Sequence, residues 1–327
     1  MNSALSDVGA ALRSADNLLL ITHEHPDGDA IGSLVAAHRI LAAVGIDAPI
    51  LVPAEDEPAA EYHFLVPWDN AVRELPEDLS RTTLVMLDCG NLERSAAGEA
   101  GSNASAIVNI DHHHDNTRFG SINHVVDTAS CTAEIVWNLA AELGAEVDQL
   151  TATALYVGLV TDTGRFMYDN TGPEAHEMAA DLIRIGVPVA AMFRRIYEGI
   201  PIGRARLLGR ALNNIERHSD GRLTLTWLSR EDFDQTEAID GWSEGVIDHL
   251  RSIEGTEVAA VIREPVGNPD LKRISLRAAN DDVDVSRIAR AGGGGGHRGA
   301  AGFSSDLSPE GLREFLLEQM AAEPSQL

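Results

Sequence analysis

The chain has 327 residues, 44% of them hydrophobic, and a formal net charge of −26. This charge argues against a protein that coats duplex DNA, because such binding needs a broad cationic surface. No run approaches the ~20 apolar residues of a membrane span, and two cysteines exclude a disulfide framework. We expect a cytoplasmic protein, because the first residues lack the basic start and apolar middle of a secretory signal.

Strands and helices are predicted to alternate in the first half of the chain. Short apolar runs predict strands at 18–22, 46–52, 82–87, 106–110 and 125–127. Helical spacing of apolar residues predicts helices at 29–44, 131–143 and 147–160. This alternation is typical of an α/β fold in which a mostly parallel, doubly wound sheet carries helices on both faces.

A second, smaller α/β domain is predicted after a helical connector. The length favours two domains, since a single core stops growing near ~250–300 residues. We expect a first domain at 1–187, a helix–turn–helix connector at 188–212 and a second domain at 213–327. In the second domain, strands are predicted at 222–229, 257–264 and 271–278, and helices at 240–253, 285–291 and 309–320.

Acids and imidazoles follow four separate segments of the first domain. "LLLIT" leads into "HEHPDGD", and the other three segments are "TTLVMLD", "AIVNIDHHH" and "ALYVGLVTD", so that the candidates are His23, Asp27, Asp29, Asp88, Asp111, His112, His113, His114 and Asp162. Ligands of open parallel sheets collect at the carboxyl ends of the strands. One aspartate at such a position is more often a turn or cap residue, but four coincident segments favour a shared site.

Divalent cations would make such a cluster of acids stable. Carboxylates at close range oppose one another's ionisation, and bridging carboxylates can hold two ions ~3.5–4 Å apart. A mixture of carboxylate and imidazole suits Mn²⁺, with Mg²⁺ or Co²⁺ as alternatives. The competing interpretation is an acid-rich cluster of helix caps without metal.

A glycine-rich segment, "GGGGGHRGAAG" at 292–302, marks the second domain. Consecutive glycines allow a close approach of the backbone, and their N–H groups can cradle an anion. The alternative is a flexible linker, which the ordered-looking "HRGAAGF" disfavours. The residues predicted to bind substrate are Gly294, Gly295, Gly296, His297, Arg298 and Arg277, with Arg118 as a weaker candidate.

The motifs together resemble those of a known enzyme family. "HEHPDGDAIGS", "LDCG", "IDHHH" and "VTDTG" occur in the order of the four motifs of the DHH family of phosphoesterases. The glycine-rich segment is similar to a motif of the C-terminal domain associated with that family. The resemblance covers almost the whole chain.

The resemblance implies roles for individual residues. One ion would be bound by His23, Asp27, Asp88 and Asp162, and the second by Asp29, Asp88, His112 and Asp162, with Asp88 and Asp162 bridging. His113 and Asp88 would be catalytic, His113 by contacting the scissile phosphate or protonating the leaving oxygen. Asp111 would orient the imidazoles, and Asn116 would fix the following loop. His25 and His114 are interpreted as surface residues.

The resemblance also implies an activity. The two-domain length is similar to that of the nano-RNase and pAp-phosphatase branch, which degrades RNA of a few nucleotides and removes the 3'-phosphate of 3'-phosphoadenosine 5'-phosphate (pAp). A water activated by two metal ions would attack the phosphate. Short single-stranded RNA or DNA and nucleotides are the expected substrates, without duplex DNA or membranes, and a homodimer is a family expectation. The alternatives are a manganese-dependent pyrophosphatase-like enzyme, a cyclic or linear dinucleotide phosphodiesterase, and a non-catalytic nucleotide-binding regulator.

Overall fold

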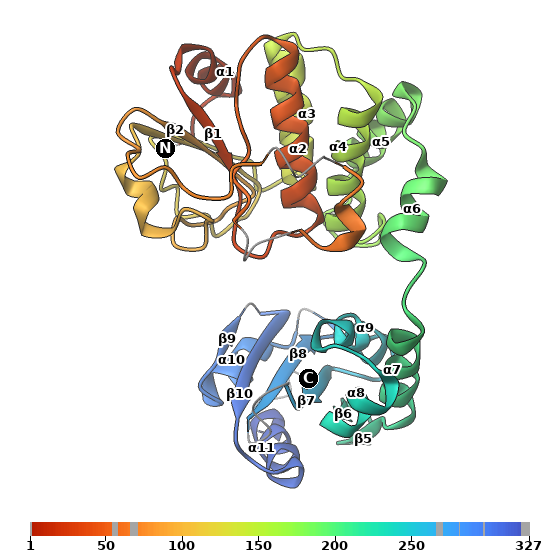
Figure 1. The fold of residues 1–327 in the computed structure, drawn as a ribbon. Helices are drawn as coiled ribbons and strands as arrows, with labels where there is room; N and C mark the ends of the chain where they lie inside the picture. Colours follow the sequence, from red (N-terminus) through yellow and green to blue (C-terminus); the bar gives the residue numbers. More distant parts are fainter. Residues whose placement is uncertain are drawn as a thin grey trace. The chain divides into compact units, whose positions relative to one another are not determined.

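The computed structural model describes residues 2–53, 58–65, 71–265, 271–280, 282–296 and 298–321. The chain divides into two compact units, Met1–Glu198 and Gly199–Leu327, which run from red to green and from green to blue in Figure 1. The expected connector is shared between them. Helix α6 (Val189–Tyr197) belongs to the first unit, and helix α7 (Ile202–Asn213) to the second.

The first unit contains a sheet of four parallel strands. They are β1 (Leu18–Ile21), β2 (Thr83–Leu87), β3 (Ala106–Asp111) and β4 (Ile122–Val125), in the order β1-β2-β3-β4. Because all four are parallel, their carboxyl ends meet at one edge of the sheet. The strand predicted at 125–127 is observed earlier in the chain, as β4. Val126 lies beyond the end of β4, where its N–H donates to the Asp111 carbonyl.

The strand predicted at 46–52 is reduced to isolated bridges. Ile50 pairs with Leu20 of β1, and Leu51 pairs with Val72. Pro49 has no N–H group to donate to a neighbouring strand, which limits regular pairing to this short edge contact.

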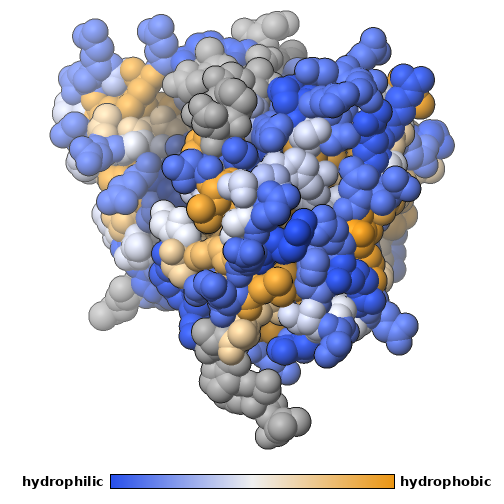
Figure 2. All heavy atoms as spheres, turned by 90° about the horizontal axis from the view of Figure 1, so that it is seen from below, coloured by the Kyte–Doolittle hydropathy of each residue, from blue (hydrophilic) through white to orange (hydrophobic). Residues whose placement is uncertain are grey.

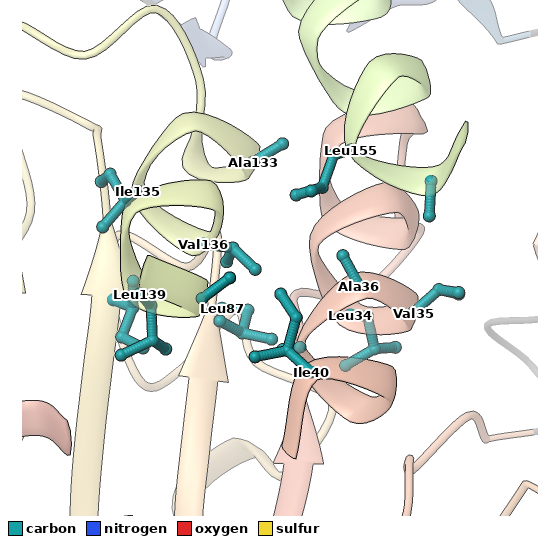
Figure 3. Close-up of a cluster of buried hydrophobic side chains, with 14 of the residues drawn as sticks. Leu34, Val35, Ala36, Ile40, Leu87, Ala133, Ile135, Val136, Leu139 and Leu155 are labelled. Atoms are coloured by element: carbon teal, nitrogen blue, oxygen red, sulfur yellow. The ribbon is translucent and has the colours of Figure 1, made fainter. Parts of the chain in front are cut away.

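Helices lie on one side of this sheet and bury the larger core. Those that contact the strands are α1 (Leu5–Ser14), α2 (Gly28–Ala43) and α3 (Thr132–Leu143). A second layer, α4 (Gln149–Asp162) and α5 (Pro173–Ile185), packs against α2 and α3, and α6 joins the same core. Ile40 of α2 and Val136 of α3 point toward one another near Leu87 at the end of β2 (Figure 3). The other face is covered by loop residues and short 3-10 turns, including η4 (Gly98–Asn103). Among the residues that the structure describes, the α-helical cover expected on both faces is thus found on one.

Helices α2 and α4 pack closely because glycines line their contact. A Cβ atom on Gly32 would lie 2.4 Å from the Ala154 carbonyl oxygen and 2.8 Å from the Gly158 nitrogen. A Cβ atom on Gly158 would lie 2.6 Å from the Asp29 carboxylate. The glycines therefore allow the start of α2 to lie against α4.

Gly32→Ala is expected to lower the free energy of unfolding of the first unit by roughly 1–3 kcal/mol, because the added methyl group overpacks a backbone contact. Gly209→Ala in α7 is the matched control, since a Cβ atom there meets nothing within 4 Å. It is expected to stabilise the second unit by about 0.5–1 kcal/mol. Scanning calorimetry measures both, and equal stabilisation by the two substitutions would contradict the close packing.

The second unit contains a mixed sheet in the order β5-β6-β7-β8-β10-β9. The strands are β5 (Glu216–His218), β6 (Leu223–Leu228), β7 (Val258–Arg263), β8 (Lys272–Ala278), β9 (Gly295–Gly296) and β10 (Ala300–Ser305). Strands β6 and β7 are parallel, and the other neighbours are antiparallel. The three strands predicted here are confirmed as β6, β7 and β8.

Helices cover both faces of the second sheet. On one face lie α7, α8 (Arg230–Thr236) and α9 (Val246–Arg251), and on the other α10 (Val285–Ala291) and α11 (Pro309–Ala321). The helix predicted at 240–253 is wrong as a single element. It is divided into η5 (Asp240–Ser243) and α9, because Gly245 between them has a φ of +84°.

The surface is mostly polar where it is visible. Figure 2 shows a face dominated by hydrophilic residues, with small apolar areas scattered over it. In the described ranges of the chain, every helix is too short or too polar to cross a lipid bilayer. The polar surface agrees with the high content of charged residues in the sequence.

Candidate metal centre

The candidate ligands lie where strands end and helices begin or end. Asp88 directly follows β2, and Asp111 is the last residue of β3. Asp27 caps α2 by accepting hydrogen bonds from the N–H groups of Asp29 (3.0 Å) and Ala30 (3.1 Å). The fourth segment differs from the expected strand end, because Asp162 is the last residue of helix α4.

The structure brings the six expected ligands together in two groups. His23, Asp27 and Asp88 form one group, and Asp29, His112 and Asp162 form another, with one ligand atom per residue within 4.8 Å of the others. A third group on the same criterion contains Asp88, His112 and His113. Asp88 thus belongs to two groups, as a bridging residue would. Bridging by Asp162 stays a prediction.

Two imidazoles direct their Nε2 atoms at the carboxylates. The Nδ1–H of His23 donates to the Glu24 carbonyl (2.8 Å), and Nε2 lies 3.8 Å from Asp88 Oδ2. In His112, Nδ1 faces the Ala129 carbonyl at 3.4 Å, and Nε2 lies 3.5 Å from Asp162 Oδ2. A histidine that donates from Nδ1 carries its lone pair on Nε2, which is the arrangement of a metal ligand.

Three of the carboxylates, Asp29, Asp88 and Asp162, lie where a bare anion is destabilised. Asp29 and Asp88 are 1% and 2% exposed. Burial, reinforced by neighbouring carboxylates, raises the pKa of Asp29, Asp88 and Asp162 to about 7 each. Divalent cations would offset this repulsion and would accept the Nε2 lone pairs of the histidines. The residues present therefore fit a site for divalent cations.

Asp29 also holds helix α3 in place. Its Oδ2 accepts the N–H of Thr132 (2.6 Å), and its Oδ1 accepts the N–H of Ala133 (3.0 Å) and the Ser33 hydroxyl (3.1 Å). The residue that precedes α3, Cys131, makes no side-chain cap bond. Asp29 therefore caps the amino end of α3, and its Oδ2, with one protein donor, retains a lone pair for a cation.

Asp88 is held in a left-handed backbone conformation with a φ of +56°. The Thr132 hydroxyl donates to its Oδ1 (2.9 Å), and the carbonyl of Cys89 accepts from the side-chain amides of Asn109 and Asn116 at 3.1 Å each. Sequence reasoning missed Thr132 and Asn109. The sequence offered a signal for Asn109, which is a polar residue inside the apolar run "AIVNID". It offered no comparable signal for Thr132.

Asp111 orients His113. The Nδ1–H of His113 donates to Asp111 Oδ1 (2.8 Å), and Asn116 donates to Asp111 Oδ2 (2.6 Å). Burial alone would raise the pKa of Asp111, but these hydrogen bonds lower it below the ordinary value. The hydrogen bond that His113 donates to the Asp111 carboxylate raises the pKa of His113 to about 9. His113 is thereby held protonated, with 43% of its side chain exposed.

Comparisons with known proteins identify the family of the chain. The model of the DHH family N-terminal domain matches residues 17–159, and that of the DHHA1 domain matches residues 233–322. A Thermus thermophilus protein named bifunctional oligoribonuclease and PAP phosphatase NrnA is 33% identical over 97% of this chain and 93% of the relative. The chain belongs to the DHH family. The resemblance drawn from the motifs is confirmed.

Other DHH relatives extend along most of the chain. A Bacillus subtilis protein of the same name is 25% identical and covers 88% of this chain and 89% of the relative. Among solved structures, an exopolyphosphatase-related protein from Bacteroides fragilis is similar with a TM-score of 0.88 and 23% identity, over 97% of this chain and 95% of that one. This likeness confirms the α/β fold.

The glycines of the DHHA1 domain form a short strand rather than a linker. Gly295 and Gly296 make up β9, which pairs with Gly302 and Ala301 of β10. A Cβ atom on Gly294 would lie 2.2 Å from the Gly302 carbonyl oxygen, whereas one on Gly295 would meet nothing within 4 Å. Some of these glycines are thus required by packing, and others leave open backbone.

The predicted substrate-binding arginines lie in different surroundings. Arg277 of β8 pairs with Ala300 of β10, whose other neighbour is the glycine strand β9. The carbonyl of Arg298 accepts a hydrogen bond from Val285 at the start of α10. Arg118 belongs to the other unit and donates to the Asn2 side chain (3.1 Å). His297 lies outside the described residues.

Proposed function

We propose that this DHH protein is a metal-dependent phosphoesterase that hydrolyses short oligonucleotides and removes the 3'-phosphate of pAp. One observation carries the proposal: the six expected ligands gather in two groups compatible with two cations, and Asp88 also lies in a third group with His112 and His113. The similarity to proteins named for these two activities over most of the chain supports it.

The proposed chemistry divides between cations and side chains. We propose Mn²⁺ in two positions, one at His23, Asp27 and Asp88 and one at Asp29, His112 and Asp162. When bound, such cations activate water and offset the charge of the phosphate. His113, held protonated by Asp111, is the group of this chain that can donate a proton at Nε2 to the leaving oxygen.

The substrate would also contact residues outside the metal groups. We propose that Arg277, Arg298, His297 and the open backbone of the glycine strand bind its terminal phosphate or ribose, with Arg118 as a further candidate. Strand β10 lies between β9 and β8 and pairs with both, which supports the grouping of the glycines with Arg277. Exclusion of duplex DNA and of membranes, a cytoplasmic location and a homodimer stay predictions of the sequence.

A substrate panel tests the proposal. Purified protein with Mn²⁺ is offered an RNA dinucleotide, pAp, a cyclic dinucleotide, inorganic pyrophosphate and a long single strand of RNA. We expect the dinucleotide and pAp to be hydrolysed fastest. Hydrolysis of pyrophosphate alone would select the pyrophosphatase-like alternative, and a preference for the cyclic compound the phosphodiesterase alternative. Hydrolysis of none would favour a non-catalytic binding module.

A further inference from the structure

A tightly anchored turn follows the candidate ligand Asp162. Gly164, Arg165 and Phe166 have φ values of +54°, +65° and +64°. The Thr163 carbonyl oxygen accepts from the N–H groups of Met167 (2.9 Å) and Tyr168 (3.0 Å). Successive non-glycine residues in the left-handed region cost free energy, and such strain is concentrated at functional sites.

The turn closes back on Asp162. The side-chain amide of Asn170 lies 3.1 Å from the Asp162 carbonyl oxygen and 3.3 Å from its Oδ2. The same amide donates to the Ser130 carbonyl (2.8 Å), in the segment that leads into α3. Residues 163–170 therefore form a loop that starts directly after Asp162 and returns to it through Asn170.

The side chains of this turn point in two directions. Arg165 lies over the ring of Tyr197 at 5.3 Å from its centroid, and Phe166 stacks on His176 with a centroid separation of 5.0 Å. These two side chains anchor the turn to α6 and α5. Met167 and Tyr168 instead face solvent.

Tyr168 presents a supported aromatic ring. A Cβ atom on Gly164 would lie 2.4 Å from Tyr168 Cζ, so the ring rests on the glycine backbone. The residue is nevertheless 49% exposed, and its neighbour Met167 is 79% exposed. One side of the ring is thus covered and part of the residue is open to solvent, in the loop that runs from Asp162 to Asn170 and that Asn170 ties back to the Asp162 carboxylate.

We propose that Tyr168, flanked by Met167, is a stacking platform for a nucleobase of the substrate. The proposal rests on the proposed function and adds a determinant of specificity to it. A chain with a net charge of −26 gains little affinity from general attraction to phosphate. Stacking on an aromatic ring contributes about 1–3 kcal/mol per base and is independent of charge.

The test measures the coupling between ring and base. Hydrolysis of an RNA dinucleotide and of its analogue lacking one base is followed for the wild type and for Tyr168→Ala. We expect the substitution to raise KM for the complete dinucleotide roughly 10-fold with little change in kcat, since ~1.4 kcal/mol corresponds to a factor of ten. We expect no such rise for the analogue from which the stacked base is missing.

Two control variants sharpen the result. Tyr168→Phe retains the ring and should restore the wild-type KM, and Ile183→Ala removes an exposed apolar side chain of α5 (47% exposed) without effect. A 2-aminopurine base in the dinucleotide should lose its fluorescence on binding wild-type protein with Ca²⁺ in place of Mn²⁺, and should lose less with Tyr168→Ala.

Each outcome decides between the two proposals. An unchanged KM in Tyr168→Ala, or an equal rise for all analogues, would overturn the platform while leaving the hydrolase intact. Failure of the wild type to hydrolyse any nucleotide would instead overturn the proposed function, and the platform with it.

Discussion

Asp88→Asn is expected to reduce Mn²⁺-dependent phosphoester hydrolysis by roughly 10³-fold or more, because this side chain belongs to two of the candidate ligand groups. An amide carries no charge and is a poor ligand for a divalent cation. The variant should fold, since asparagine tolerates the left-handed backbone of this position and its Oδ1 can accept the Thr132 hydroxyl as before.

The measurement has a binding arm and a kinetic arm. Electron paramagnetic resonance of Mn²⁺ counts bound ions, and hydrolysis of the dinucleotide gives the rate. Asp47→Asn is the matched control, because it makes the same chemical change at an exposed residue. Full activity and full Mn²⁺ occupancy in Asp88→Asn would refute the bridging role, whatever the substrate is.

Removal of divalent cations is expected to make stability fall as the pH rises. The raised pKa values of Asp29, Asp88 and Asp162 mean that the folded protein retains protons that the unfolded chain releases between pH ~4 and ~7. Stability therefore decreases across this window, on the order of 4 kcal/mol for one such group. His113, with a pKa of about 9, adds a stabilisation that is complete below pH ~6.5 and is lost toward pH 9.

Calorimetry of the EDTA-treated protein at about pH 5 and about pH 8 checks this sign. Mn²⁺ should raise Tm more at the higher pH, because the ligands bind as anions and binding to the folded state alone stabilises it. In Asp88→Asn, the loss of Tm between the two pH values should be smaller. A metal-free Tm that increases across the same interval in the wild type would contradict the arrangement of the buried carboxylates.

The local spacing of apolar residues was sufficient to predict many of the helices and strands. The helix predicted at 285–291 is observed as α10, and strands β1, β2, β6, β7 and β8 lie within a residue of the predicted bounds. Elements without a local signal were missed. Strand β10, "AAGFSS", has small residues of low strand propensity and forms because it pairs with β8 along six residues.

The candidate site was predictable at the level of ligand types but not of their supports. Turn-forming acids at successive segment ends indicated a shared centre, whereas the cap of Asp29 on α3 joins residues more than a hundred positions apart. The clamp of Asn109 and Asn116 on the Cys89 carbonyl likewise depends on how three segments meet. The sequence separation of the partners in such contacts follows no pattern, because only the tertiary fold brings them together.

The cap that Asp29 places on α3 bears on how an inert enzyme should be prepared for capture of intact substrate in crystals. Asp29→Ala would expose two backbone N–H groups at the start of a helix, at a cost of about 0.5–2 kcal/mol, and would shift the Thr132 hydroxyl that contacts Asp88. Soaking experiments would then report a rearranged pocket, so Asp88 is the better position for silencing turnover while the geometry is retained.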